Sequence, residues 1–173
     1  MSPASLRKHE VAALVRIQSL TASSGMRRGA VILSQVGEHA LAWTALGLLG
    51  AALDPEQRRP WLRATATVVG SHAVSVVAKR VVRRHRPSDP RIRVQVATPS
   101  DWSFPSSHAA STTAAAVAYS RLLRRRWPLF SIPVMMTSRV IVGVHYPTDV
   151  LSGALIGAVM GRGVARTRPV SGS

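Results

Sequence analysis

Two histidines and one carboxylate lie at points where an apolar chain turns. His108 follows two serines in SFPSSHAAS, where a polar loop leads into an Ala-rich segment, and His145 precedes Asp149 by four residues. A carboxylate bonded to one ring nitrogen of a histidine fixes the tautomer and leaves the other nitrogen free to attack. A second imidazole can protonate the leaving oxygen. The pattern therefore indicates nucleophilic catalysis by His145, oriented by Asp149, with His108 as the proton donor.

Cations and hydroxyl groups accompany these residues. Lys79 and Arg86 are seven residues apart, which is two turns on one helical face, and Arg139 precedes His145 by six. Pro105 suits the start of a helix that Ser106 or Ser107 can cap. The free N–H groups at the start of a helix bind anions. These cations, hydroxyls and N–H groups together are typical of a phosphate-binding site. Between Lys79 and Arg86 stand more basic residues than membrane anchoring requires, namely Arg80, Arg83, Arg84 and His85.

These groups together predict phosphoryl transfer through a histidine. Lys79, Arg86 and Arg139 would neutralise the charge that develops on the phosphate, so no metal and no other cofactor is expected. A metal site built from two histidines and one aspartate is the alternative, but the surrounding cations oppose it.

Composition limits the class of protein. The chain has 173 residues, a net charge of +16 and no cysteine, so we expect one domain without disulfides or Cys-ligated metal. The charge would suit nucleic acid, an anionic membrane or phosphorylated substrates. We expect no nucleic-acid binding, because the arginines do not gather on one polar helix with aromatic side chains. A basic membrane scaffold without activity is the non-enzymatic alternative.

The fold class is predicted to be all-α, an integral membrane helical bundle in the cell membrane. Small residues and terminal tryptophans support membrane packing of about five transmembrane helices. Residues 1–30 are predicted as an amphipathic interfacial segment, residues 31–165 as the membrane domain and 166–173 as a disordered tail. The five expected spans are 31–53, 61–82, 106–123, 129–145 and 148–164.

Five spans would bring the ends of the second and fourth helices and the starts of the third and fifth to one side. The residues of the predicted phosphate site would therefore meet on that side of the membrane. The flanking Lys and Arg residues do not decide whether that side is the cytoplasm or the outside. Glu38 and His39 would lie about 10 Å from the start of the first helix, and His72 is seven residues before Lys79. Ionisable groups at that depth are functional candidates, so these three are predicted to line the pocket. Pairing of Glu38 within the bundle is the alternative.

Three ordered segments resemble the signatures of the type 2 phosphatidic acid phosphatase superfamily. They are KRVVRRHRP, PSSH and SRVIVGVHYPTD, spanning Lys79 to Asp149, with Ser107 where the family usually has Gly. The resemblance implies a membrane lipid phosphatase in which His145 forms a phosphohistidine, Asp149 orients it and His108 is the general acid. It also implies that Lys79, Arg86, Ser106, Ser107 and Arg139 bind the phosphate.

Within the superfamily, the chain most resembles actinobacterial enzymes that act on a polyprenyl-linked sugar. The phrases GEHALAWTALG, VAKRVVRRHRP and GVHYPTDVLSG are similar to the decaprenylphosphoryl-phosphoribose phosphatases of arabinan precursor synthesis. The expected partner is therefore a polyprenyl-linked phosphate lipid in the membrane. Polyprenyl diphosphate phosphatases and phosphatidic acid or phosphatidylglycerophosphate phosphatases are the alternatives within the superfamily.

Overall fold

The computed structural model of the chain describes residues 3–36 and 40–164. The described residues contain no strand, only an isolated antiparallel bridge between His85 and Trp102. The all-α prediction is confirmed. The helices are α1 (Pro3–Leu20), α2 (Ser24–Val36), α3 (Leu41–Leu53), η2 (Pro55–Gln57), α4 (Arg58–Val82), α5 (Ser107–Leu122), η3 (Trp127–Phe130), α6 (Ser131–Ile141) and α7 (Pro147–Arg162).

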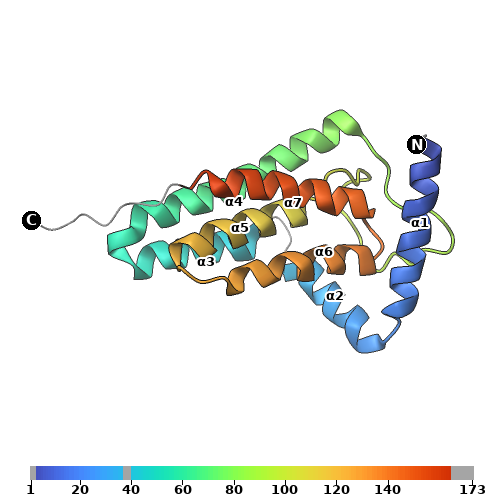
Figure 1. Cartoon of the computed structure of the whole chain (residues 1–173), viewed down its shortest axis with the longest axis horizontal. Coiled ribbons are helices and arrows are strands. Elements are labelled where there is room, and N and C mark those ends of the chain that lie inside the picture. The colour runs from blue at the N-terminus through green and yellow to red at the C-terminus, as the bar shows by residue number, and fades with distance from the viewer. Residues whose placement is uncertain (1–2, 37–39, 165–173) are drawn as a thin grey trace, which may run out of the picture.

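Helix α5 is the centre of the bundle. It packs against α3, α4, α6 and α7, and Figure 1 shows these helices running along the long axis of the molecule. Its Ala-rich sequence explains this position, because small side chains allow helices to approach closely. Residues 109–116 are all buried. The PSSH motif at the start of α5 is thereby held on the innermost helix.

A long loop, residues 83–106, folds back over one end of the bundle. Helix α4 ends where Arg83 adopts a left-handed conformation, with φ 50°, and its N–H donates to the carbonyl of Lys79 at 3.0 Å. The two halves of the loop are joined by the Ser103 N–H, which donates to the carbonyl of Arg84 at 2.7 Å. The loop therefore has a fixed course between α4 and α5.

Helix α1 lies across this same end of the bundle (Figure 1) and contacts α6 and α7. Its apolar residues divide into two groups. Leu14 and Val11 are buried in a cluster with Val140, whereas Leu6 and Leu20 are 40% and 75% exposed. The helix thus packs on the bundle through its middle.

The apolar segment 31–53, expected to form one helix, is divided in the structure. Helix α2 ends at Val36 and α3 begins at Leu41, so the expectation of one continuous span is wrong. Ala40, directly before α3, has φ 61°, in the left-handed region. A right-handed helix cannot continue through that conformation.

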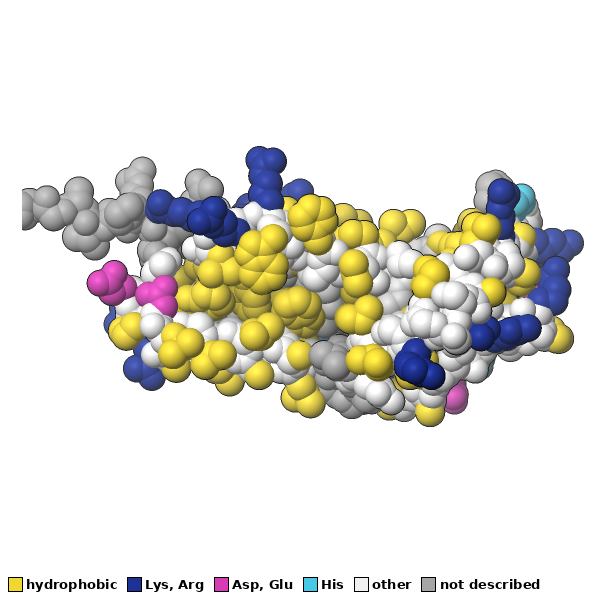
Figure 2. Space-filling model, turned by 90° about the horizontal axis from the view of Figure 1, so that it is seen from below, with side chains coloured by type: hydrophobic (Ala, Val, Ile, Leu, Met, Phe, Trp, Pro, Cys, Tyr) yellow, Lys and Arg dark blue, Asp and Glu magenta, His cyan; other side chains and the backbone are white. Residues whose placement is uncertain are grey.

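No helix in residues 3–36 or 40–164 combines the length and the apolar character needed to cross a membrane. Helix α3 is strongly apolar but has 13 residues, about 20 Å at 1.5 Å per residue, against a hydrocarbon core of about 30 Å. The predicted number of spans is therefore not confirmed. On the face shown in Figure 2, hydrophobic side chains nonetheless gather over the middle of the molecule, with Lys and Arg on either side of them.

Candidate active site

A cavity of about 960 Å³ opens where α4 and α6 end and α5 begins. The structure brings most of the residues singled out in the sequence to this cavity. Ser106 and Asp149 lie behind its wall and are fully buried. Glu38 and His39 lie outside the described residues. The predicted residues in the lining are His72, Lys79, Arg86, Ser107, His108, Arg139 and His145.

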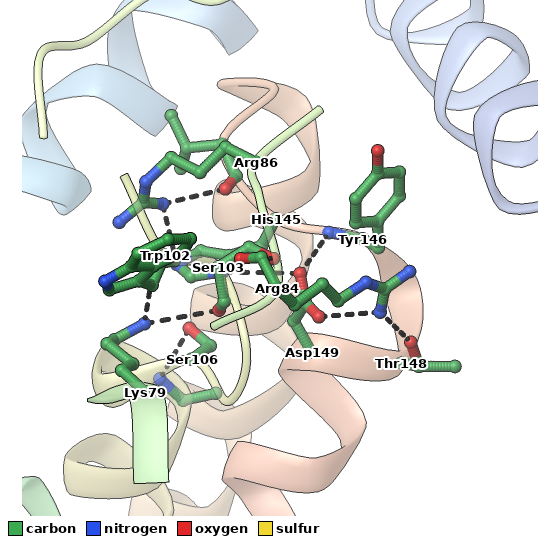
Figure 3. A network of polar contacts seen from close by, with 12 residues as sticks. Lys79, Arg84, Arg86, Trp102, Ser103, Ser106, His145, Tyr146, Thr148 and Asp149 are labelled. Carbon is green, nitrogen blue, oxygen red and sulfur yellow. Dashed lines mark hydrogen bonds and ion pairs between the residues drawn. The ribbon is translucent and has the colours of Figure 1, made fainter. Parts of the chain in front are cut away.

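His145 lies in the short loop between α6 and α7, beside Asp149. The two side chains are 2% and 0% exposed, and Nδ1 of His145 is 3.7 Å from Oδ2 of Asp149, slightly beyond hydrogen-bond distance. Oδ2 accepts instead from the Tyr146 N–H at 2.8 Å. The other ring nitrogen, Nε2, is 3.5 Å from Arg86 Nη1 (Figure 3). The Asp149 carboxylate is thus on the Nδ1 side and a cation on the Nε2 side.

The tight loop before His145 depends on Gly143. This residue has φ +79°, and a Cβ there would lie 2.5 Å from the carbonyl oxygen of Arg93. A side chain would therefore be strained by both the backbone conformation and the contact. Glycine lets the chain reverse between α6 and His145 while the loop 83–106 packs against it.

Two cations on either side of the cavity bond to backbone carbonyls. Lys79, in the last turn of α4, donates to the carbonyls of Trp102 and Ser103, each at 3.2 Å. Arg86 donates to the carbonyls of Ser100 and Val144, each at 2.8 Å. Burial lowers the pKa of Arg86 to about 10, although the charge of Asp149 opposes this, so the guanidinium stays protonated at neutral pH. These backbone bonds hold both side chains in fixed positions at the cavity.

Ser34 of α2 holds two further site residues. Its carbonyl oxygen is 3.0 Å from Nε2 of His108, and its hydroxyl accepts from the buried guanidinium of Arg139. A carbonyl only accepts, so Nε2 of His108 carries a hydrogen in this arrangement. Ser34 thereby fixes the imidazole from α5 relative to the cation from α6.

The start of α5 has the geometry of an anion site. Ser106 is its N-cap, and the hydroxyl accepts from the Ala109 N–H at 3.4 Å. Ser107 is the first helical residue and lines the cavity. The first N–H groups of a helix have no intrahelical acceptor, so they favour a negative charge placed there.

Asp149 is also bound from the side opposite His145. Arg84 donates to Oδ1 of Asp149 at 2.8 Å and to the hydroxyl of Thr148 at 2.7 Å (Figure 3), and it forms an ion pair with Glu10 of α1. The guanidinium lies 4.2 Å from the centroid of the Tyr146 ring. Three distant parts of the chain therefore meet behind the His145–Asp149 pair.

Several of these residues are not marked by any pattern in the sequence. Ser34 and Glu10 carry no spacing signal, because they lie in helices far from the motifs. Arg84 stood out only as one more basic residue between Lys79 and Arg86. Trp102 is one of the tryptophans near segment ends that were expected at the membrane interface. It lines the cavity instead, and its ring centroid is 4.7 Å from that of His85. A cluster of three metal-ligating side chains is absent from the described residues.

The chain matches known phosphatases over most of its length. Residues 60–172 match the family model for the PAP2 superfamily. The chain is 50% identical over 145 residues to the decaprenylphosphoryl-5-phosphoribose phosphatase of Mycolicibacterium smegmatis, covering 83% of this chain and 81% of the relative. The enzyme of the same name from Mycobacterium tuberculosis is 48% identical over 153 residues, covering 88% and 86%.

A solved structure has the same fold. The PAP2-type phosphatidylglycerolphosphate phosphatase of Bacillus subtilis superposes with a TM-score of 0.73 at 19% identity, covering 94% of this chain and 85% of that one. The resemblance carried by the three motifs between Lys79 and Asp149 is confirmed. The chain belongs to the PAP2 superfamily, whose members are lipid phosphatases.

Proposed function

We propose that the protein removes the 5-phosphate from decaprenylphosphoryl-5-phosphoribose through a phosphohistidine on His145, without a metal. The observation that carries this is the buried His145–Asp149 pair at a cavity lined by Lys79, Arg86 and Arg139. The names of the mycobacterial relatives support the substrate.

In the first step, Nε2 of His145 attacks the phosphorus and the bond from phosphorus to the ribose 5-oxygen breaks. Asp149 accepts a hydrogen bond from Nδ1 and stabilises the positive charge that develops on the ring. This requires Nδ1 and Oδ2 to approach from 3.7 Å, and such contacts commonly tighten only when substrate binds. His108, as an imidazolium favoured by the negative charge of the bound phosphate, gives a proton to the leaving oxygen and becomes neutral. The cations and the α5 N-terminus stabilise the phosphoryl oxygens.

In the second step, water attacks the phosphohistidine. His108 takes a proton from the water, the P–N bond breaks and inorganic phosphate leaves. His145 and His108 return to their initial states, so the cycle uses only water and needs no redox partner.

The size and polarity of the cavity support a sugar-linked substrate. Beyond the cations, the lining includes polar groups that can bond to hydroxyls: Gln35, His72, Gln95 and Thr98. A ribose ring would use such groups, whereas a simple diphosphate has no hydroxyls to offer them. The predicted pocket role of Glu38 and His39 belongs to this same proposal.

The proposal places the protein in the cell membrane as a multi-pass bundle. Large apolar side chains are exposed on several helices, including Leu49 of α3 (52%), Val77 of α4 (61%) and Leu155 of α7 (66%). Monomeric soluble proteins rarely expose apolar surface on this scale, and lipid chains are the partner that such a surface fits. A polyprenyl-linked substrate would reach the cavity from the same lipid phase.

The test is phosphate release by detergent-purified protein in the presence of EDTA. The substrates are decaprenylphosphoryl-5-phosphoribose, a polyprenyl diphosphate and phosphatidic acid. We expect release chiefly from the first, with kcat reduced at least about a thousandfold in His145→Ala. Preference for either of the other lipids would overturn the substrate. Equal release by wild type and His145→Ala would overturn the histidine mechanism and favour a basic scaffold.

A further inference from the structure

Three charged side chains, Glu10, Arg84 and Asp149, form a linked group on the side of Asp149 away from His145. Glu10 and Asp149 are almost completely buried, with side chains 5% and 0% exposed, and the Arg84 side chain between them is 24% exposed. Such charges are weakly screened by solvent and act strongly on their neighbours. Each of the three residues comes from a different part of the chain: α1, the loop after α4 and the start of α7.

Both oxygens of Asp149 are fixed by this arrangement. Oδ1 accepts from Arg84 at 2.8 Å, and Oδ2 accepts from the Tyr146 N–H at 2.8 Å and faces Nδ1 of His145. Glu10 in turn holds Arg84 and Thr148, since its carboxylate accepts from the Thr148 N–H at 3.3 Å. The carboxylate that orients the nucleophile therefore has one direction in which it can point.

The charges also matter for the reaction. Arg84 alone would cancel the charge of Asp149 and weaken its stabilisation of the ring that becomes positive when phosphorus is attacked. Glu10 adds a second negative charge, so the group of three carries a net charge of −1, the same as an isolated Asp149. Asp149 is thus held in a fixed position by Arg84, and the net charge beside His145 stays at −1.

We propose that Glu10 and Arg84 are positioning residues for the His145–Asp149 pair, with Glu10 restoring the negative charge that Arg84 would otherwise cancel. This inference rests on the proposed reaction through His145. Helix α1, outside the three family motifs, then contributes directly to the active site.

A series of charge-neutralising variants tests the inference in the full-length protein. Glu10→Gln leaves Arg84 opposite Asp149 with a net charge of zero, and we expect kcat to fall about 10- to 100-fold with little change in KM. Glu10→Asp keeps the charge and most of kcat. The double variant Glu10→Gln/Arg84→Gln returns the net charge to −1, so its kcat should exceed that of Glu10→Gln.

Matched controls are Glu56→Gln and Arg59→Gln, which remove an exposed charge of each sign and should leave kcat unchanged. Thermal melting in detergent separates activity from folding. If the double variant is less active and less stable than Glu10→Gln, the two residues are only a structural tie and the inference is wrong. Unchanged kcat in Glu10→Gln would also overturn it.

Orthovanadate binding gives a readout that does not depend on turnover. Vanadate forms a five-coordinate adduct with an attacking nitrogen, so its Kd should follow the same order among the variants. If wild type hydrolyses substrate or binds vanadate and Glu10→Gln does so equally well, this inference is wrong and the proposed function still stands. Neither hydrolysis nor vanadate binding by wild type would overturn the proposed function as well.

Discussion

The proposed nucleophile, His145, can attack phosphorus only in its neutral form, and its surroundings favour that form. Burial, reinforced by the charges of Arg139, Lys79 and Arg86, lowers the pKa of His145 well below its usual value of 6.5. A lower pKa means that the ring stays unprotonated as the pH falls. The same cations that we propose to bind the phosphate therefore keep the His145 ring unprotonated.

The acidic limb of the pH profile of kcat/KM reports the protonation of His145 in the free enzyme. Because the pKa of His145 is lowered, we predict that kcat/KM does not fall until the pH is below 6.5. In Arg86→Gln one of the cations is gone, so the pKa of His145 rises and the limb moves to higher pH. The measurement is the pH profile of phosphate release for both proteins. The substrate's own ionisation near pH 6 is common to both, so a shift belongs to the enzyme. Arg91→Gln, an exposed change, should leave the limb in place, and a coincident limb for Arg86→Gln would contradict the argument.

At the scale of the elements, the site depends on close packing of α7 against α5. Gly153, Gly157 and Gly161 recur every four residues and share one face of α7. A Cβ on Gly153 would lie 2.3 Å from the carbonyl oxygen of Ser106, and one on Gly157 would lie 2.2 Å from that of Ala110. The N-cap of α5 is therefore placed by backbone-to-backbone contact with the helix that carries Asp149.

Gly157→Ala should push the two helices apart, because the new methyl group meets backbone that cannot turn away. We expect a loss of about 1–3 kcal/mol in stability together with reduced phosphate release. Thermal melting in detergent and activity assays measure both. Gly29→Ala is the matched control, since a Cβ there meets nothing within 4 Å and the change should be neutral or stabilising. Equal melting temperatures for the two variants would show that the α5–α7 contact is not tight.

At the scale of the whole molecule, one end carries the site and the middle carries the apolar surface. Figure 2 shows hydrophobic side chains over the central part, with Lys and Arg toward the ends. This separation fits a bundle whose middle meets lipid and whose site lies at one membrane surface. A phosphate head group would then enter the cavity while its polyprenyl chain stays in the bilayer.

The absence of cysteine makes single-cysteine labelling a direct test of this arrangement. We predict that Leu155→Cys, on the exposed apolar face of α7, reacts with a membrane-impermeant maleimide only after detergent is added. Arg91→Cys, in the loop beside the site, should react from one side only, and that side gives the orientation of the cavity. Both variants should retain phosphate release. Labelling of Leu155→Cys in sealed vesicles before detergent is added would contradict membrane burial of α7.

The sequence by itself determined the helical class, the family and the residues of the three motifs. It could do so because histidine, lysine and arginine at fixed spacings have specific chemical uses, and because short segments position them. The periodic apolar segments predicted helices for the same physical reason, since one turn of helix follows from local spacing alone.

Only the tertiary structure decided which residues support the site. Glu10 and Arg84 are 74 positions apart, and Ser34 is 74 positions from His108. Such partners are chosen by how helices pack, which local spacing does not encode. The same holds for the break before α3, where Ala40 adopts a left-handed conformation that the apolar pattern around it does not signal. The three motifs contain the side chains that we propose to react. The packing of α1 and α2 against the bundle determines which other side chains hold them in position.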